Sequence, residues 1–133
     1  FDCSGSEVSI SNIDFINIGD KALSIGEGTS INGSNLVLDT MDLGIAVKDS
    51  STAIFDQVSF IDTYLSFVQY NKKAVYGVSQ TSLSNVSFEG DIGLYYLIQE
   101  HESLIIDDEV YIPTNLSKSD QIFDALINER PLR

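Results

Sequence analysis

The sequence of 133 residues is poor in several residue types on which folds and active sites are often built. Its single cysteine, Cys3, cannot form an internal disulfide, so a packed core has to hold the chain together. Its only arginines, Arg130 and Arg133, lie at the C-terminal end, which excludes an arginine clamp for phosphate or carboxylate from the rest of the chain. Its one histidine, His101, does not by itself indicate a catalytic mechanism, and we interpret it as a surface-loop residue.

Positive charge is also scarce. Twenty acidic side chains stand against seven basic ones, and the formal net charge of −13 would repel phosphate backbones and anionic lipid headgroups. No apolar run approaches the ~20 residues that cross a bilayer. We therefore expect neither nucleic acid nor a membrane as a partner.

A five-residue pattern returns four times along the chain. It reads SNIDF at Ser11–Phe15, SNLVL at Ser34–Leu38, DQVSF at Asp56–Phe60 and SNVSF at Ser84–Phe88. The last residues of successive copies are 23, 22 and 28 positions apart. Periods of this length indicate a solenoid, in which each unit buries its apolar face by stacking on its neighbours.

Other columns repeat in the same register. The stretch ALSI at 22–25 is followed by GIAV at 44–47, a shift of 22, and TSI at 29–31 by TAI at 52–54, a shift of 23. Apolar and polar residues alternate in these stretches, as in strands. The predicted inward residues are Ile13, Phe15, Leu23, Ile25, Ile31, Leu36, Leu38, Ile45, Val47, Ile54, Val58, Phe60, Leu65 and Phe67.

An amide side chain precedes the first apolar residue of every copy. These residues are Asn12, Asn35, Gln57 and Asn85. Asparagine tolerates the left-handed backbone of a tight turn, and stacked amides can hydrogen-bond from one coil to the next. The pattern predicts a structural ladder of side-chain amides.

These repeats and the amide ladder resemble the right-handed parallel β-helices of the pectin-lyase-like superfamily, over roughly Val8 to Ile112. The resemblance implies an all-β, right-handed, single-stranded parallel β-helix, here of about four coils. It also implies an extracellular or cell-surface setting, with polysaccharide as a partner. The hydrolase motifs of that superfamily are missing from the sequence. The only Asp-Asp pair, Asp107-Asp108, lies beyond the regular coils.

The C-terminal segment differs from the coils. We place the coils at residues 1–112 and a C-terminal cap at 113–133, where Ile122, Phe123, Leu126 and Ile127 share one helical stripe. Ser117 or Ser119 would be the N-cap and Asp120 would lie in the first turn. We expect this helix to cover the open end of the last coil. The chain begins without a leader, and we interpret it as the C-terminal fragment of a larger protein, with upstream domains of the same chain as partners.

Three aspartates, Asp20, Asp42 and Asp62, each follow the motif by a few residues. If they aligned on adjacent coils their carboxylates would repel, and a hard cation such as Ca²⁺ would relieve the repulsion. The alternative, which we favour, is three solvated loop aspartates and no cofactor.

A second candidate site is aromatic. Tyrosine rings on a flat sheet can stack on sugar rings, while their hydroxyls and neighbouring polar groups bond to sugar hydroxyls. The candidate glycan-binding residues are Tyr64, Tyr70, Asn71, Lys72 and Tyr76. Burial of most of these rings in the core is the alternative.

We identify no catalytic residue in the sequence. The favoured hypothesis is a non-catalytic segment of a surface or extracellular protein, either a structural stalk or a glycan-binding adhesion module. The alternative is a part of a polysaccharide lyase or other carbohydrate-active enzyme whose catalytic coils lie upstream. In a lyase the only basic candidates within the coils would be Lys21, Lys48, Lys72 and Lys73.

Overall fold

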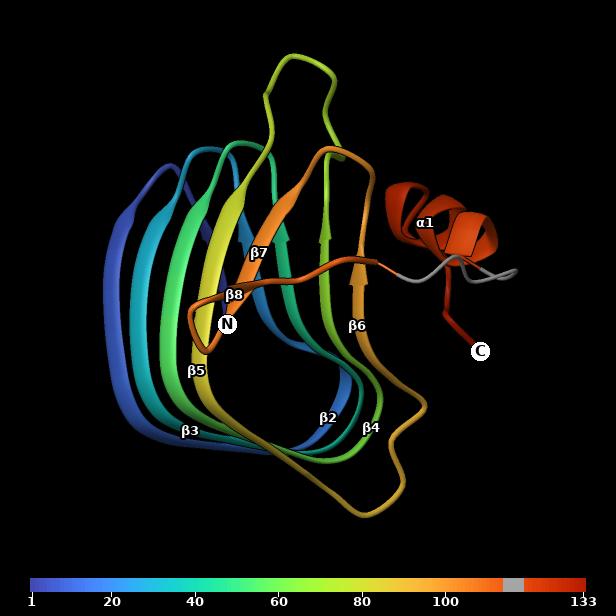
Figure 1. Cartoon of the computed structure of the whole chain (residues 1–133). Coiled ribbons are helices and arrows are strands. Elements are labelled where there is room, and N and C mark those ends of the chain that lie inside the picture. The colour runs from blue at the N-terminus through green and yellow to red at the C-terminus, as the bar shows by residue number, and fades with distance from the viewer. Residues whose placement is uncertain (114–118) are drawn as a thin grey trace.

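The computed structural model describes residues 1–113 and 119–133 (Figure 1). Strands dominate, and a single helix follows them among the described residues. The elements are β1 (Asp2–Ser4), β2 (Glu7–Gly26), β3 (Ser30–Lys48), β4 (Thr52–Tyr70), β5 (Gln80–Glu89), β6 (Leu94–Ile98), β7 (Ser103–Ile106), β8 (Glu109–Val110) and α1 (Ser119–Ile127). No helix in these two ranges is both long and apolar enough to cross a membrane.

The strands stack in parallel as successive turns of a β-solenoid, in the order β1-β2-β3-β4-β5-β7, with β6 paired to β4 (Figure 1). This confirms the predicted parallel β-helix. The solenoid has about five turns, not about four. The sequence pattern undercounts because the partial turns that contain β1 and β7 lack the five-residue motif.

The repeated amides stand at a corner of each turn. Asn12, Asn35, Gln57 and Asn85 all have left-handed backbone, with φ of 56°, 54°, 58° and 52°. The chain bends there from one face of the solenoid to the next, which explains why asparagine returns at this position. The side chains are exposed.

The ladder of amides is partial. Asn35 Nδ2 donates to Asn12 Oδ1 at 2.7 Å, whereas Asn85 Nδ2 donates to Asp56 Oδ1 at 2.7 Å. Among the described residues, Gln57 forms no side-chain hydrogen bond within this column. The left-handed backbone of the corner is thus common to all four copies of the motif, whereas hydrogen bonding between the amides is not.

Replacing Asn35 by alanine should lower the free energy of unfolding by about 1–2 kcal/mol, from the left-handed strain and the lost hydrogen bond together. Asn35→Gly also removes the hydrogen bond, but glycine adopts positive φ without strain. This control should therefore lower the free energy of unfolding clearly less than Asn35→Ala does. Urea unfolding followed by circular dichroism measures both. Equal losses in the two variants would contradict the corner explanation.

Columns of like residues fill the interior, as predicted. Leu38 and Phe60, aligned on neighbouring turns, are fully buried, and Phe60 stacks on Phe88 with ring centroids 5.4 Å apart. Ile13 and Phe15 of the first turn are only half-buried because no strand lies beyond them.

The prediction that Ile54 faces inward is wrong. Its side chain is 51% exposed, because β3 and β4 pair with a constant shift of 22 residues that aligns Ile31 with Ala53. A slip of one residue moves a strand's side chains to the opposite face, so the assumed shift of 23 inverted the assignment. Phe55 fills the interior instead, over Gly33, where a Cβ would come within 2.6 Å of its ring.

The prediction for Leu65 is also wrong. Leu65 is fully buried, but it belongs to a second apolar cluster outside the solenoid interior, together with Leu43 and Val68. This outer face of β3, β4 and β6 is covered by α1 through Ile122 and Leu126.

The helix therefore lies against the side of the solenoid, over β3, β4 and β6, and not across the open end of the last coil as predicted (Figure 1). Asp120 is in its first turn as predicted, while Ser117 lies outside the described residues. At that end β8 turns back antiparallel to β7 and pairs with Ile105 and Ile106. Asp107 and Asp108 form that turn with φ of 48° and 66°, as a two-residue hairpin requires.

Candidate functional site

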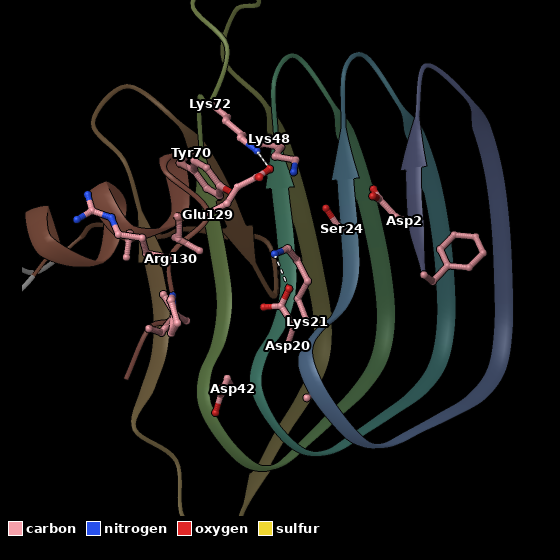
Figure 2. A pocket seen from close by; sticks show the side chains of 16 residues that line it. Asp2, Asp20, Lys21, Ser24, Asp42, Lys48, Tyr70, Lys72, Glu129 and Arg130 are labelled. Atoms are coloured by element: carbon pink, nitrogen blue, oxygen red, sulfur yellow. Dashed lines mark hydrogen bonds and ion pairs between the residues drawn. The ribbon is translucent and has the colours of Figure 1, made fainter.

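A groove separates α1 and the C-terminal residues from the outer face of β2, β3 and β4 (Figure 2). We call it the lateral groove. Its volume is about 640 Å³, within the range of small-molecule sites. Its lining includes Asp20, Lys21, Asp42, Lys48, Tyr70 and Lys72 from the solenoid side and Glu129 and Arg130 from the C-terminal side.

The repeat places the key side chains of the groove. Lys48 and Tyr70 are register partners on successive turns, and Gly26 lies 22 residues before Lys48, one turn earlier. A Cβ on Gly26 would come within 2.9 Å of Lys48 Cε, so the stem of Lys48 lies across this glycine. The glycine leaves the space in which this stem lies, and a larger residue would displace the stem.

Most charges in the groove are paired. Lys21 Nζ lies 3.1 Å from Asp20 Oδ2, Arg133 lies 3.0 Å from Asp42 Oδ1, and Lys72 pairs with Glu129. The hydrogen bond from Lys72 lowers the pKa of the Glu129 carboxyl. The Lys72–Glu129 pair, drawn in Figure 2, and the Arg133–Asp42 pair join the solenoid to the C-terminal residues.

Lys48 is the exception. Within residues 1–113 and 119–133, no carboxylate pairs with its ammonium, although every other lysine or arginine described has such a partner. Burial lowers the pKa of Lys48, the neighbouring charges of Lys72 and Lys21 lower it further, and the charges of Asp2 and Asp49 act in the opposite direction with smaller effect. Lys48 is thus the one described basic side chain lining the groove that has no carboxylate within ion-pair distance.

Tyr70 closes the inner side of the groove. Its side chain is 1% exposed, and its ring packs on Phe123 with centroids 6.4 Å apart. Burial, and then the charges of Asp49 and Glu129, raise the pKa of the Tyr70 hydroxyl well above its usual range. The phenol is therefore protonated at neutral pH and can donate a hydrogen bond, while its ring faces have no room for a sugar.

The predicted glycan-binding residues do not form one site. Tyr70 and Lys72 line the lateral groove, whereas Tyr64 lies beneath the Arg133 guanidinium, 4.8 Å from its ring centroid. Asn71 and Tyr76 belong to the connection between β4 and β5, where Asn71 Nδ2 donates to the Tyr76 carbonyl at 2.9 Å.

The three predicted aspartates are also divided. Asp20 and Asp42 both line the lateral groove, where each pairs with a basic side chain. Asp62 stands at a corner with φ of 50°, aligned with Thr40, and its Oδ1 accepts from the Asp91 N–H at 2.7 Å. In the part of the chain that is described, no group of three metal-ligating side chains gathers.

The remaining acidic and histidine candidates lie elsewhere. His101 is exposed, with its Nε2 3.7 Å from Glu100 Oε1. Asp107 and Asp108 form the β7–β8 turn, and Asp107 Oδ1 accepts from the Asn85 N–H at 3.0 Å.

Lys48 was considered only as one of four basic candidates, and its setting was missed. The signal was present in the 22-residue spacing, since positions 26, 48 and 70 read Gly, Lys and Tyr. The spacing does not predict the C-terminal side of the groove, because those residues lie outside the repeats.

Comparisons of the chain with protein-family models, curated proteins and solved structures gave no match. The parallel β-solenoid therefore stands on the structure itself, and any function has to be argued from these side chains.

Proposed function

We propose that this chain is a non-catalytic segment of a longer β-solenoid, a rigid stalk in a surface or extracellular protein of pectin-lyase-like type. The observation that carries the proposal is the unpaired edge of the solenoid at β2. β1 pairs with three residues of this 20-residue strand, and the rest of the edge carries apolar side chains without a strand beyond it.

The open edge is the first long strand. β1 pairs only with Ser24–Gly26, so the rest of β2 has a partner on the β3 side alone. Its Ile13 and Phe15 are half-buried, whereas their partners Leu36 and Leu38 are at most 1% exposed. An uncovered edge of this length recruits a further strand.

The fitting occupant is another parallel coil of the same chain. β1 already continues the solenoid beyond β2, in register with its last residues, and a preceding coil would end in such a strand. Full burial of two or three apolar side chains would stabilise the stack by several kcal/mol, at ~1.5–3 kcal/mol each.

Glycan binding is the second candidate function, favoured by the lateral groove and its hydroxyl and ammonium donors. Catalysis within these residues is not supported, because the Asp-Asp pair is a hairpin turn and His101 is exposed beside Glu100. A carbohydrate-active enzyme would need catalytic coils in another part of the protein.

The stalk proposal is tested by adding a coil. A copy of Ser30–Ser51 is placed directly before Glu7 in place of residues 1–6, and the control carries serine at the inward positions of that copy. The longer chain should melt cooperatively, at least about 5 °C above the control, and bind less of a hydrophobic dye. Equal melting of the two chains would overturn the proposal.

The non-catalytic part has its own test. Incubation with neutral and acidic polysaccharides, with and without Ca²⁺, should release no new chain ends, whether or not the protein is retained. New chain ends that persist after repurification would contradict it.

A further inference from the structure

We infer that the lateral groove is a binding site for a small monocarboxylate with an apolar body, whose carboxylate is held by Lys48 and the Tyr70 hydroxyl. The inference does not depend on the stalk proposal. It starts from the one described basic side chain of the groove that has no carboxylate within ion-pair distance.

Lys48 is held in place without being neutralised. Its stem lies across Gly26, where a Cβ would come within 2.9 Å of Lys48 Cε, and the ammonium is near the like charges of Lys72 and Lys21, which outweigh the more weakly acting carboxylates of Asp2 and Asp49. Those two lysines have their own carboxylates, Asp20 and Glu129. A half-buried cation beside like charges is stabilised by an added anion, and the gain is larger where water is partly excluded.

Tyr70 supplies a second donor. It pairs in register with Lys48, and its phenol is protonated at neutral pH. A neighbouring ammonium and hydroxyl can each donate to one oxygen of a carboxylate, which makes charge-assisted hydrogen bonds.

The charge balance of the groove favours a single negative charge. Four basic side chains are matched there by four acidic ones, Asp2, Asp20, Asp42 and Glu129. A dianion such as a phosphate monoester would meet these carboxylates with twice the repulsion that a monoanion meets, so a single carboxylate beside Lys48 is the better tolerated anion.

The opposite side of the groove fits an apolar body. α1 and the residues after it contribute Ala125, Leu126 and Leu132 to the lining. Ligand sites typically combine such an apolar lining with a few oriented polar groups. A volume of about 640 Å³ accommodates a chain of several carbon atoms besides the carboxylate.

The test uses hexanoate as the probe and hexanamide as its uncharged counterpart, on the full chain. In ¹H–¹⁵N NMR titrations hexanoate should shift the amides of Gly26, Lys48 and Tyr70 saturably, and hexanamide and hexyl phosphate should bind at least several-fold more weakly. Binding should weaken as salt is raised.

Two variants decide the role of Lys48. Lys48→Met keeps an apolar side chain of similar length and removes the charge. It should lower the affinity for hexanoate at least about tenfold. The matched control is Lys73→Met, because Lys73 pairs with Glu27 outside the groove and its loss should leave hexanoate binding unchanged. Gly26→Ala, which displaces the Lys48 stem, should also weaken binding and serves if Lys48→Met fails to fold.

Several results would overturn the inference. They are equal binding of hexanoate by Lys48→Met and the parent chain, equal binding of hexanoate and hexanamide, tighter binding of hexyl phosphate, and shifts that lie outside the groove. Absence of hexanoate binding by the folded parent chain would overturn it as well.

Discussion

Replacing Gly44 by alanine is expected to lower the free energy of unfolding by about 2–4 kcal/mol, an effect of overpacking in a core that cannot expand. A Cβ at this position would lie 2.4 Å from the Ser66 carbonyl oxygen and 2.8 Å from Phe60 Cε1. The first atom is backbone of the next turn, and the second belongs to a fully buried ring. Neither can move without shifting a strand.

The matched control is Gly19→Ala, where an added Cβ meets no atom within 4 Å. There the only change is the reduced freedom of the unfolded chain, so stability should stay within about 1 kcal/mol of the parent. Urea unfolding followed by circular dichroism gives both values. A loss below about 1 kcal/mol in Gly44→Ala would mean that neighbouring turns yield more readily than the contacts indicate.

The repeat pattern was sufficient to predict the solenoid, because every turn needs the same corner and the same interior columns. It failed where two similar triplets suggested a shift of 23 and the true pairing used 22, which placed Ile54 on the wrong face. Periodicity identifies the columns, but a one-residue ambiguity at a corner can be resolved only by the pairing itself.

The position of α1 has a signal in the sequence of the strand that it covers. The stretch Leu43–Val47 is buried on both faces, and such strands read as continuous apolar runs. A run of that kind implies a cover on the outer face, which α1 supplies. The lateral groove follows from that packing, so sequence alone could place Lys48 and Tyr70 in one column but could not bring Glu129 opposite Lys72.

The second large effect is expected at Asp49, a fully buried carboxylate at the corner after β3. Asp49 Oδ1 accepts hydrogen bonds from the N–H groups of Lys72 and Lys73 at 2.7 and 2.8 Å, which ties the connection after β4 to the preceding turn. Asp49 also has left-handed backbone, with φ of 57°. Asp49→Ala leaves two donors unpaired and strains the corner, and should cost about 2–4 kcal/mol.

Asp49→Asn separates these causes from charge. Asparagine keeps the acceptor and tolerates positive φ, while it removes a buried charge whose second oxygen, Oδ2, has no partner among the described residues. Its stability should therefore lie within about 1 kcal/mol of the parent chain in the same urea experiment. A loss in Asp49→Asn as large as that in Asp49→Ala would show that the negative charge, and not the acceptor geometry, holds the corner.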